Sequence, residues 1–228
     1  IRTKEQFIDY VSDKLEIENG ELEDYCSNDD ILNEQYGLNS DNFMALIVPE
    51  TYEVNWTTHI NELFELIEKS YNEVWTKAKK DKAKAIGYTV PEVVTIASIV
   101  QSESGIKTEQ QKIAGVYINR LKQDMKLQAD PTVVFANGNF DVQRVLSADK
   151  DIDSHYNTYR YKGLPPGPIC LVNTSTIDAV LNFTKHNYTY FCAKADFSGY
   201  SNFTNDYKVH MKNATAYQAA LNQKEIKR

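Results

Sequence analysis

Apolar residues recur at helical spacing in five stretches of the chain, and the segments between them are mostly polar. The pattern predicts helices over residues 4–15, 58–82, 91–104, 108–121 and 214–224. Thr3 and Thr108 stand at the starts of the first and fourth of these helices, and each is followed three residues later by a Gln. This spacing is typical of a capping box, in which the side chains satisfy free N–H groups of the first turn.

The remaining segments have different patterns. Residues 16–45 are acidic and rich in Asn and Gly, which favours short helices and turns. Extended chain or strands are predicted at residues 45–48, 51–54, 188–193 and 201–203 from their β-branched and aromatic composition. Regular patterns weaken between Leu127 and Pro168, and long irregular segments of a compact domain often carry function. The mixture predicts an α+β fold.

Glu103 is the residue whose position suggests chemistry. It stands at the C-terminal tip of the helix predicted over residues 91–104, just before Gly105, which is a natural helix stop. The negative end of the helix dipole and partial burial both disfavour a charged carboxylate, so we expect a raised pKa. A Glu of this kind can donate a proton near neutral pH, as cleavage of a glycosidic bond requires. The alternative is a solvated Glu at a frayed helix end.

Composition narrows the range of partners. The net charge of −7 argues against nucleic acid or an anionic membrane surface. The 15 Tyr residues suit sugar binding, although half-buried packing is the simpler role for most of them. Cys26, Cys170 and Cys192 lack the spacing of a metal or redox motif, so we expect free thiols, with one disulfide as the alternative. No metal site and no cofactor are predicted, because the four His form no ligand pattern either.

A series of short motifs follows Glu103 in the chain. The motifs are Ile118-Asn119-Arg120-Leu121, Leu127-Gln128-Ala129-Asp130-Pro131-Thr132-Val133, Tyr156-Asn157-Thr158-Tyr159 and Gly163-Leu164-Pro165-Pro166-Gly167-Pro168-Ile169, with Tyr190-Phe191 and Asn202-Phe203 near the end. In this order they resemble the endolytic murein transglycosylases, also called the YceG-like family, over about residues 45 to 222. Each motif alone is weak evidence, whereas several in order with compatible spacing are hard to obtain by chance.

The resemblance implies an enzyme of the bacterial cell envelope. Such enzymes are anchored in the inner membrane by one N-terminal helix, with the catalytic domain outside the cytoplasm. They cut nascent peptidoglycan strands internally, between N-acetylmuramic acid and N-acetylglucosamine, and leave a 1,6-anhydro-muramic end. Besides glycan strands, the expected partners are peptidoglycan synthases or division proteins. We expect the anchor to precede Ile1, residues 1–44 to be the remainder of a small LysM-like module and its connection, and residues 45–228 to form a mixed catalytic domain.

The resemblance also assigns roles to individual residues. Glu103 is the expected general acid and then general base, and relatives often carry a second Glu where this chain has Gln101. The residues expected to bind substrate are Gln101, Ser104, Asn119, Arg120, Gln128, Asp130, Tyr156, Asn157 and Tyr159. Asn119 is expected to face the cleft, and the two tyrosines with Asn157 to line sugar subsites.

For some of these residues, a purely structural role is an alternative to a role in substrate binding or catalysis. Arg120 either positions a carboxylate or an N-acetyl carbonyl, or forms a structural ion pair. Asp130, expected to share one face of an extended segment with Gln128, is either a second catalytic group or the start of a turn before Pro131. The loop over residues 163–169, with its three prolines, is expected to be a rigid wall of the cleft.

Two rival functions stay open. The first is a peptidoglycan hydrolase that uses Glu103 and Asp130, since hydrolysis normally takes two carboxylates. A lyase needs one carboxylate, because the C6 hydroxyl of the sugar is an intramolecular nucleophile that is already in position. The second rival is a non-catalytic envelope module that only binds glycan or division proteins.

Overall fold

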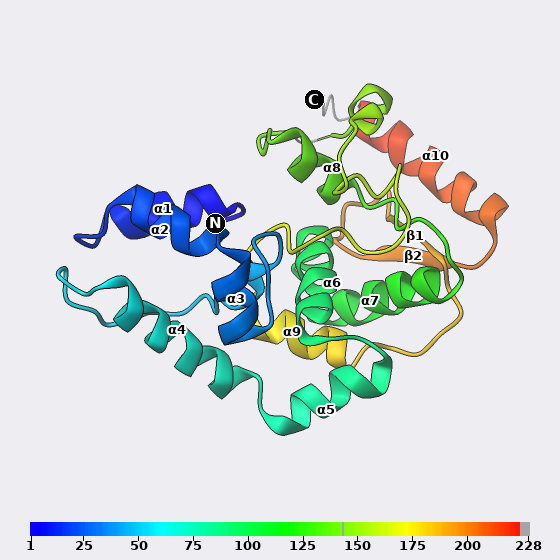
Figure 1. Cartoon of the computed structure of the whole chain (residues 1–228). Coiled ribbons are helices and arrows are strands. Elements are labelled where there is room, and N and C mark those ends of the chain that lie inside the picture. Colours follow the sequence, from blue (N-terminus) through cyan, green and yellow to red (C-terminus); the bar gives the residue numbers. More distant parts are fainter. Residues whose placement is uncertain (143, 224–228) are drawn as a thin grey trace. The chain divides into compact units, whose positions relative to one another are not determined.

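Helices dominate the structure. The computed structural model describes residues 1–142 and 144–223, and within these residues two short strands form an antiparallel sheet (Figure 1). The chain divides into two compact units. Residues 1–98 and 166–177 make up the first, and residues 99–165 with the chain from Asp178 onward make up the second. The predicted α+β class is confirmed by this combination of many helices with one small sheet.

The first unit consists of short helices around an apolar core. Its elements are α1 (Lys4–Ser12), α2 (Asn19–Ser27), α3 (Asp29–Tyr36), the 3-10 helix η1 (Phe43–Ala45), α4 (Ile60–Val74), α5 (Lys77–Ile86), most of α6 (Val90–Glu103) and the start of α9 (Thr174–Leu181). The buried core includes Phe7, Leu22, Leu32, Phe43 and Phe64. The predicted first helix and the short helices between residues 16 and 45 are confirmed. The Thr3 hydroxyl oxygen accepts the Gln6 N–H at 3.2 Å, as a cap should.

Residues 45–48 and 51–54, predicted as extended chain, form no strand, and the prediction is wrong for the start of the first segment. Ala45 ends the 3-10 helix instead. The N–H group of Ile47 bonds back to the carbonyl of Met44 at 3.3 Å, so it does not pair with another strand. The apolar composition of residues 45–48 reflects burial, because residues 43–48 all belong to the interior of this unit.

The long helix predicted over residues 58–82 is divided into α4 and α5. α4 begins at Ile60, and the Glu62 carboxylate accepts the His59 N–H at 3.2 Å. The helix ends before Trp75, whose backbone leaves the helical region (φ −88°, ψ 61°) while its side chain is buried. Thr76 then caps α5. The basic run at residues 77–82 is therefore a separate, largely exposed helix and not the tail of α4.

The second unit is built on α7 and a β-hairpin. It contains the end of α6, α7 (Lys107–Lys122), α8 (Asp130–Asn137), the 3-10 helix η2 (Ser147–Asp151), the end of α9, β1 (Tyr190–Ala193), β2 (Ser201–Thr204) and α10 (Tyr207–Gln223). Residues 113–118 of α7 are all buried. Phe191 pairs with Phe203 across the hairpin and meets the ring of Tyr117 edge-on at 5.9 Å, which holds the hairpin against α7 (Figure 1). Both predicted strands are confirmed.

Helix boundaries in the second unit depart from prediction. Thr108 lies inside α7 and does not cap it, and the Gln111 side chain bonds to a distant backbone carbonyl at 3.3 Å. α8 and α9 lie where the sequence pattern predicts no helix. α8 has Pro131 in its first turn, where the missing N–H costs nothing. α10 starts at Tyr207, earlier than predicted, and residue 224 of that prediction lies outside the described residues.

In the described part of the chain, no single helix is long and apolar enough to cross a membrane; α5 and α6 meet that test only as a pair, with a bend of 79° between them. Cys26, Cys170 and Cys192 are free thiols, as expected.

Candidate active site

Glu103 is the last residue of α6, as predicted. The helix is anchored by a row of buried residues that includes Val93, Ile96, Ala97 and Val100. Its start is fixed as well, because the Glu92 carboxylate accepts the Thr89 N–H at 2.7 Å. A helix packed along most of its length leaves its final residue little freedom to move. Glu103 itself is half-buried.

Tyr117 of α7 donates its hydroxyl hydrogen to Oε1 of Glu103, with 2.7 Å between the oxygens. Tyr117 is only 2 % exposed. The sequence pattern gives this residue no role, because it falls on the buried side of a helix where spacing indicates packing alone. One signal points further: a tyrosine hydroxyl at a core position needs a partner. That partner is the candidate acid.

Desolvation raises the pKa of Glu103 to about 7. The negative charge of Asp130 acts in the same direction, whereas the Tyr117 hydrogen bond and the positive charge of Arg120 lower the pKa. The raised pKa is thus confirmed, with burial as its main cause. A carboxyl group in this range can hold a proton at rest and release it during a reaction at neutral pH.

Arg120 is buried on α7 and binds backbone carbonyls. Its Nε donates to the carbonyl of Thr189 at 2.6 Å, and its Nη1 to that of Leu127 at 2.7 Å. The guanidinium carbon lies 5.3 Å from the ring centre of Tyr190. The structural ion pair considered above is therefore not what holds this side chain. Arg120 ties the segment after α7 to the start of the hairpin and places a positive charge near Glu103.

Gln128 and Asp130 do not share a face of an extended segment, so that prediction is wrong. Gln128 has a positive φ of 50°, and Asp130 is the first residue of α8. The cause is tertiary. The Gln128 N–H bonds to the carbonyl of Thr158 at 3.1 Å, and its side-chain oxygen accepts from Arg120 at 3.3 Å. Contacts from two distant segments thus turn the chain immediately before the helix.

Asp130 is held by two groups from the segment around η2. The Tyr159 hydroxyl donates to Asp130 Oδ1 at 2.5 Å, and Lys150 Nζ lies 3.4 Å from the same oxygen. Lys150 Nζ is also 4.0 Å from the centre of the Tyr159 ring. Burial and the Asp130 charge raise the pKa of Tyr159, so its hydroxyl remains a donor. The Asp130 side chain is 50 % exposed and accessible to a ligand.

Asn157 is completely buried, and its amide serves the surrounding loop. Nδ2 donates to the carbonyls of Lys150 and Ile152 at 2.9 and 2.8 Å, and Oδ1 accepts the Tyr159 N–H at 3.0 Å. In this structure Asn157 therefore positions Lys150 and Tyr159 and presents no surface to a sugar. Tyr156, the other predicted subsite residue of this motif, is half-buried, with its ring 4.6 Å from that of Phe135.

Three further residues predicted to bind substrate are Asn119, Ser104 and Gln101, and each has a different environment. The Asn119 amide donates to the carbonyls of His186 and Tyr188 at 2.8 and 2.9 Å, so it fastens the approach to the hairpin. The Ser104 hydroxyl oxygen accepts the Ile106 N–H at 3.1 Å, where the chain turns from α6 into α7. Gln101 is half-buried in the last turn of α6.

The proline-rich loop belongs in its second half to the first unit. Gly167 lies so close to residue 41 that an added Cβ would be 1.9 Å from the Asp41 carbonyl oxygen, and only Gly fits. The Ile169 N–H donates to the Ser98 hydroxyl at 3.0 Å. These contacts agree with a fixed loop, whereas its role as a cleft wall stays a prediction.

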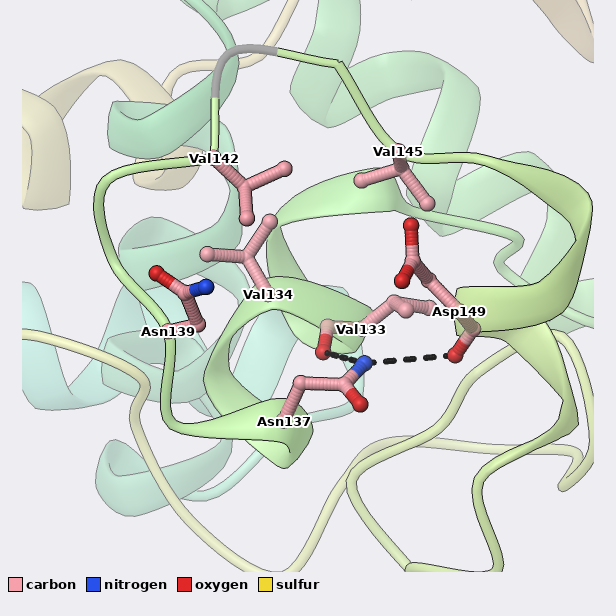
Figure 2. Close-up of a pocket in the computed structure, with 7 residues that line it drawn as sticks. All are labelled: Val133, Val134, Asn137, Asn139, Val142, Val145 and Asp149. Carbon is pink, nitrogen blue, oxygen red and sulfur yellow. Dashed lines mark hydrogen bonds between the residues drawn. The ribbon is translucent and has the colours of Figure 1, made fainter. Parts of the chain in front are cut away.

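A small hollow lies between α8 and the segment after it (Figure 2). Four valines line it, Val133, Val134, Val142 and Val145, and the Asn137 amide on its rim bonds to the carbonyls of Val133 and Asp149. About 210 Å³ of space lies within and in front of it. Its lining is mainly apolar and contains no residue of the Glu103 centre, so we do not place the chemistry here.

The structure thus brings together Glu103, Arg120, Gln128, Asp130 and Tyr159 of the predicted set, and adds Tyr117. The model of the YceG-like family matches residues 1–216 of this chain. The chain belongs to the YceG-like family. The resemblance noted from the motifs is therefore confirmed, and the match extends to residues before the motifs.

Individual relatives give the same result. The chain is 37 % identical over 179 residues to an endolytic murein transglycosylase of Bacillus subtilis (strain 168), which covers 78 % of this chain and 49 % of that protein. It is 33 % identical over 180 residues to one of Streptococcus pneumoniae (strain D39), covering 75 % and 31 %. The chain thus spans about half the length, or less, of these relatives. A crystal structure of a YceG-like protein from Listeria monocytogenes matches with a TM-score of 0.74 at 25 % identity, covering 91 % of this chain and 72 % of that one.

Proposed function

We propose that this chain carries the catalytic centre of a lytic transglycosylase that cuts peptidoglycan strands internally. The bond cleaved joins N-acetylmuramic acid to N-acetylglucosamine, and the product ends in 1,6-anhydro-muramic acid. The observation that carries the proposal is the position of Glu103 at the end of a buried helix, where the Tyr117 hydroxyl lies 2.7 Å from its Oε1 and desolvation raises its pKa to about 7. Relatives named endolytic murein transglycosylase support the substrate class.

In the proposed mechanism, one carboxyl group acts twice. Glu103 is protonated at rest and gives its proton to the glycosidic oxygen as the bond to the anomeric carbon breaks. Positive charge develops on that carbon, and the N-acetyl group of the muramic residue or nearby tyrosine and amide oxygens stabilise it. The ionised Glu103 then takes the proton from the C6 hydroxyl, whose oxygen closes the anhydro ring. No water is consumed, because the nucleophile belongs to the substrate.

The neighbours of Glu103 have supporting roles in this proposal. Asp130 is accessible and would accept a hydrogen bond from a sugar hydroxyl, while Tyr159 and Lys150 keep its carboxylate in place. Gln101, Ser104, Gln128 and Tyr156 are proposed to contact the glycan directly. Arg120, Asn119 and Asn157 act on the backbone of the segments that carry those residues.

Placement in the cell follows from the proposed substrate. The catalytic centre would work outside the cytoplasm, on a protein anchored in the inner membrane, beside peptidoglycan synthases or division proteins. The division of the chain into a LysM-like remainder (residues 1–44) and a catalytic domain (residues 45–228) also stays a prediction.

Hydrolysis is the second candidate, and one observation favours it. Asp130 is close enough to Glu103 for its charge to raise the Glu103 pKa, and its side chain is accessible. Most glycosidases use a pair of catalytic carboxyl groups. The two reactions differ in their products, since hydrolysis leaves a reducing end.

Product analysis tests the proposed function. The chain is incubated with purified peptidoglycan, and the fragments are analysed by mass spectrometry. We expect anhydro-muramic ends from the wild type and none from Glu103→Gln, which keeps the shape of the side chain but has no proton to give. Glu73→Gln, the same exchange at an exposed position of α4, is the matched control and should cleave normally. Equal cleavage by Glu103→Gln and the control would end the proposal.

A further inference from the structure

We propose that Tyr117 is a positioning residue that fixes the orientation of Glu103 and assigns the reacting proton to Oε2, the carboxyl oxygen that it does not contact. The inference rests on the proposed function, because it concerns the acid of that reaction. Neither the motif series nor the comparisons point to this tyrosine, which lies between two aliphatic residues in the most buried part of α7.

The direction of the hydrogen bond decides which oxygen carries the proton. Within the described residues, the Tyr117 hydroxyl has Glu103 Oε1 as its acceptor, at 2.7 Å. In a protonated carboxyl group the carbonyl oxygen is the better acceptor, and the other oxygen bears the hydrogen. Oε1 is therefore the carbonyl oxygen of the acid. Oε2 carries the proton and is the atom that reaches the glycosidic oxygen.

Within the described residues, Tyr117 is the one side chain that forms a hydrogen bond with the Glu103 carboxyl group. The charged and titratable groups around Glu103 are Tyr117 and Arg120 from α7, Asp130 from α8 and Tyr159 from the loop after η2. The hydrogen bonds of Arg120 go to backbone carbonyls and to the Gln128 amide, and Tyr159 donates to Asp130. Arg120, Asp130 and Tyr159 thus form no hydrogen bond with Glu103 and act on it through their charges and dipoles. They set the electrostatic environment of Glu103 and not its orientation.

The tyrosine is itself rigid enough for this task. It is almost fully buried, and the ring of Phe191 meets it edge-on. Burial and the adjacent Glu103 charge keep the pKa of Tyr117 well above its ordinary value, so its hydroxyl stays protonated throughout the reaction. A Glu side chain has several rotatable bonds, and fixing one oxygen removes most of the freedom at its end.

One fixed oxygen suits a reaction in which the same group gives and receives a proton. Oε2 releases its proton to the glycosidic oxygen as the bond to C1 breaks, and the C6 oxygen then bonds to C1 and returns its proton to Oε2. The carboxyl group does not rotate between the two steps. In the ionised state Tyr117 donates to a carboxylate, and such a charge-assisted bond is stronger than the same bond to a neutral acid.

Tyr117→Phe tests the proposal with a nearly unchanged volume. We expect kcat to fall about 10- to 100-fold, since a hydrogen bond to a charged group is lost, with KM changed less than about twofold. The loss of a contact that lowers the Glu103 pKa should also move the alkaline limb of the pH–rate profile to higher pH. Tyr217→Phe removes a hydroxyl from another half-buried tyrosine of the same unit and is the control. An alkaline limb that stays in place for Tyr117→Phe overturns the proposal, because a merely structural loss lowers the rate equally at all pH values.

Infrared difference spectroscopy gives a readout that needs no cleavage. The carbonyl band present in the wild type and absent from Glu103→Gln belongs to protonated Glu103, and its disappearance with rising pH reports the pKa. We expect a band shifted to the low frequency of a hydrogen-bonded carbonyl, and a higher midpoint in Tyr117→Phe. A wild-type band at the frequency of a free carbonyl overturns the proposal even if Tyr117→Phe fails to fold. If the chain cleaves no glycan but the band is shifted, the proposed function fails and the role of Tyr117 in orienting Glu103 stands.

Discussion

Tyr159 and Lys150 both engage Oδ1 of Asp130, the first through its hydroxyl at 2.5 Å and the second through its ammonium group at 3.4 Å. Both come from the segment that the buried Asn157 organises, so this segment determines where the Asp130 carboxylate points. A carboxylate oxygen held by two donors is well suited to shape the field around Glu103 or to bind a hydroxyl group. It is less suited to form a bond to a sugar or to carry a proton in every cycle.

Asp130→Asn should therefore keep appreciable activity, within about tenfold of the wild type, because Asn retains an acceptor for Tyr159. A general base or nucleophile would cost about 10²–10⁴-fold or more when removed. The variant should also lower the pKa of Glu103, since a nearby negative charge is gone, and shift the alkaline limb to lower pH. Steady-state rates across a pH series check both expectations. A collapse as deep as that of Glu103→Gln would promote the hydrolase.

Solvent isotope incorporation gives an independent decision between the two reactions. Anhydro ends take no oxygen from water, so fragments produced in ¹⁸O-water should have unlabelled new ends. Mass spectrometry of the wild-type digest is sufficient. Labelled reducing ends, together with an inactive Asp130→Asn, would replace the lyase assignment with hydrolysis.

The activity of the wild type should fall as pH rises through about 7. The pKa of Glu103 is raised to about 7, mainly by desolvation, and the acid must be protonated at the start of the reaction. Above the pKa the protonated fraction drops about tenfold per pH unit, and the rate should follow while chemistry is limiting. Initial rates between pH 5 and 9 provide the check. A flat profile over this range contradicts the raised pKa.

The same raised pKa predicts a cost in stability. Glu103 has a pKa of about 7 in the folded chain against an ordinary value of 4.5, so the folded state binds the proton more tightly. This tighter proton binding adds to the free energy of unfolding. The added stability is fully present below pH 4.5 and is lost as pH rises through 7. Glu103→Gln should thus gain about 1–3 kcal/mol in the free energy of unfolding relative to the wild type between pH 4 and pH 8. Urea titrations of both proteins at these two pH values measure the difference, and a gap independent of pH would contradict it.

Replacing Asn157 should destabilise the second unit. Asn157→Ala removes two donors and one acceptor that a completely buried side chain supplies to its loop, and the carbonyls of Lys150 and Ile152 lose these hydrogen bonds. We expect a loss of about 2–4 kcal/mol in the free energy of unfolding. Asn205→Ala, at an exposed position, is the control and should change stability by less than about 0.5 kcal/mol. If Asn157→Ala is as stable as the control, the loop does not depend on this amide.

Local signals made the helix that carries Glu103 predictable. An apolar stripe with helical period, Pro91 at the start and Gly105 after the end are all contained within one short stretch of sequence. The conformation of Gln128 is different in kind, because its positive φ depends on Thr158 and Arg120, which no local pattern connects to it. α8 was missed for a related reason, since its composition of β-branched and small residues suits a strand as well as a helix.

The sequence motifs indicated which residues matter more readily than they indicated what each residue does. Asn119 and Asn157 stand in the motifs that carry the family resemblance, yet each bonds to backbone carbonyls. An amide has the same donors and acceptors for a peptide group as for a sugar, so sequence alone does not separate the two uses. Tyr117 differs from these two residues. Its apolar neighbours in the sequence indicate core packing alone, yet its hydroxyl forms a hydrogen bond with the candidate acid, Glu103.

The hydrogen bonds of Arg120 affect which amino-acid substitutions the residues around Glu103 can tolerate. It recognises carbonyl groups, which every amino acid supplies, and no side chain at residue 126 or 189 is needed for its bonds to those positions. Exchanges such as Lys126→Ala or Thr189→Ser leave these acceptors in place. A single guanidinium group can thus hold two segments whose side chains remain open to replacement, and the neighbourhood of Glu103 can acquire new contact residues without losing its framework.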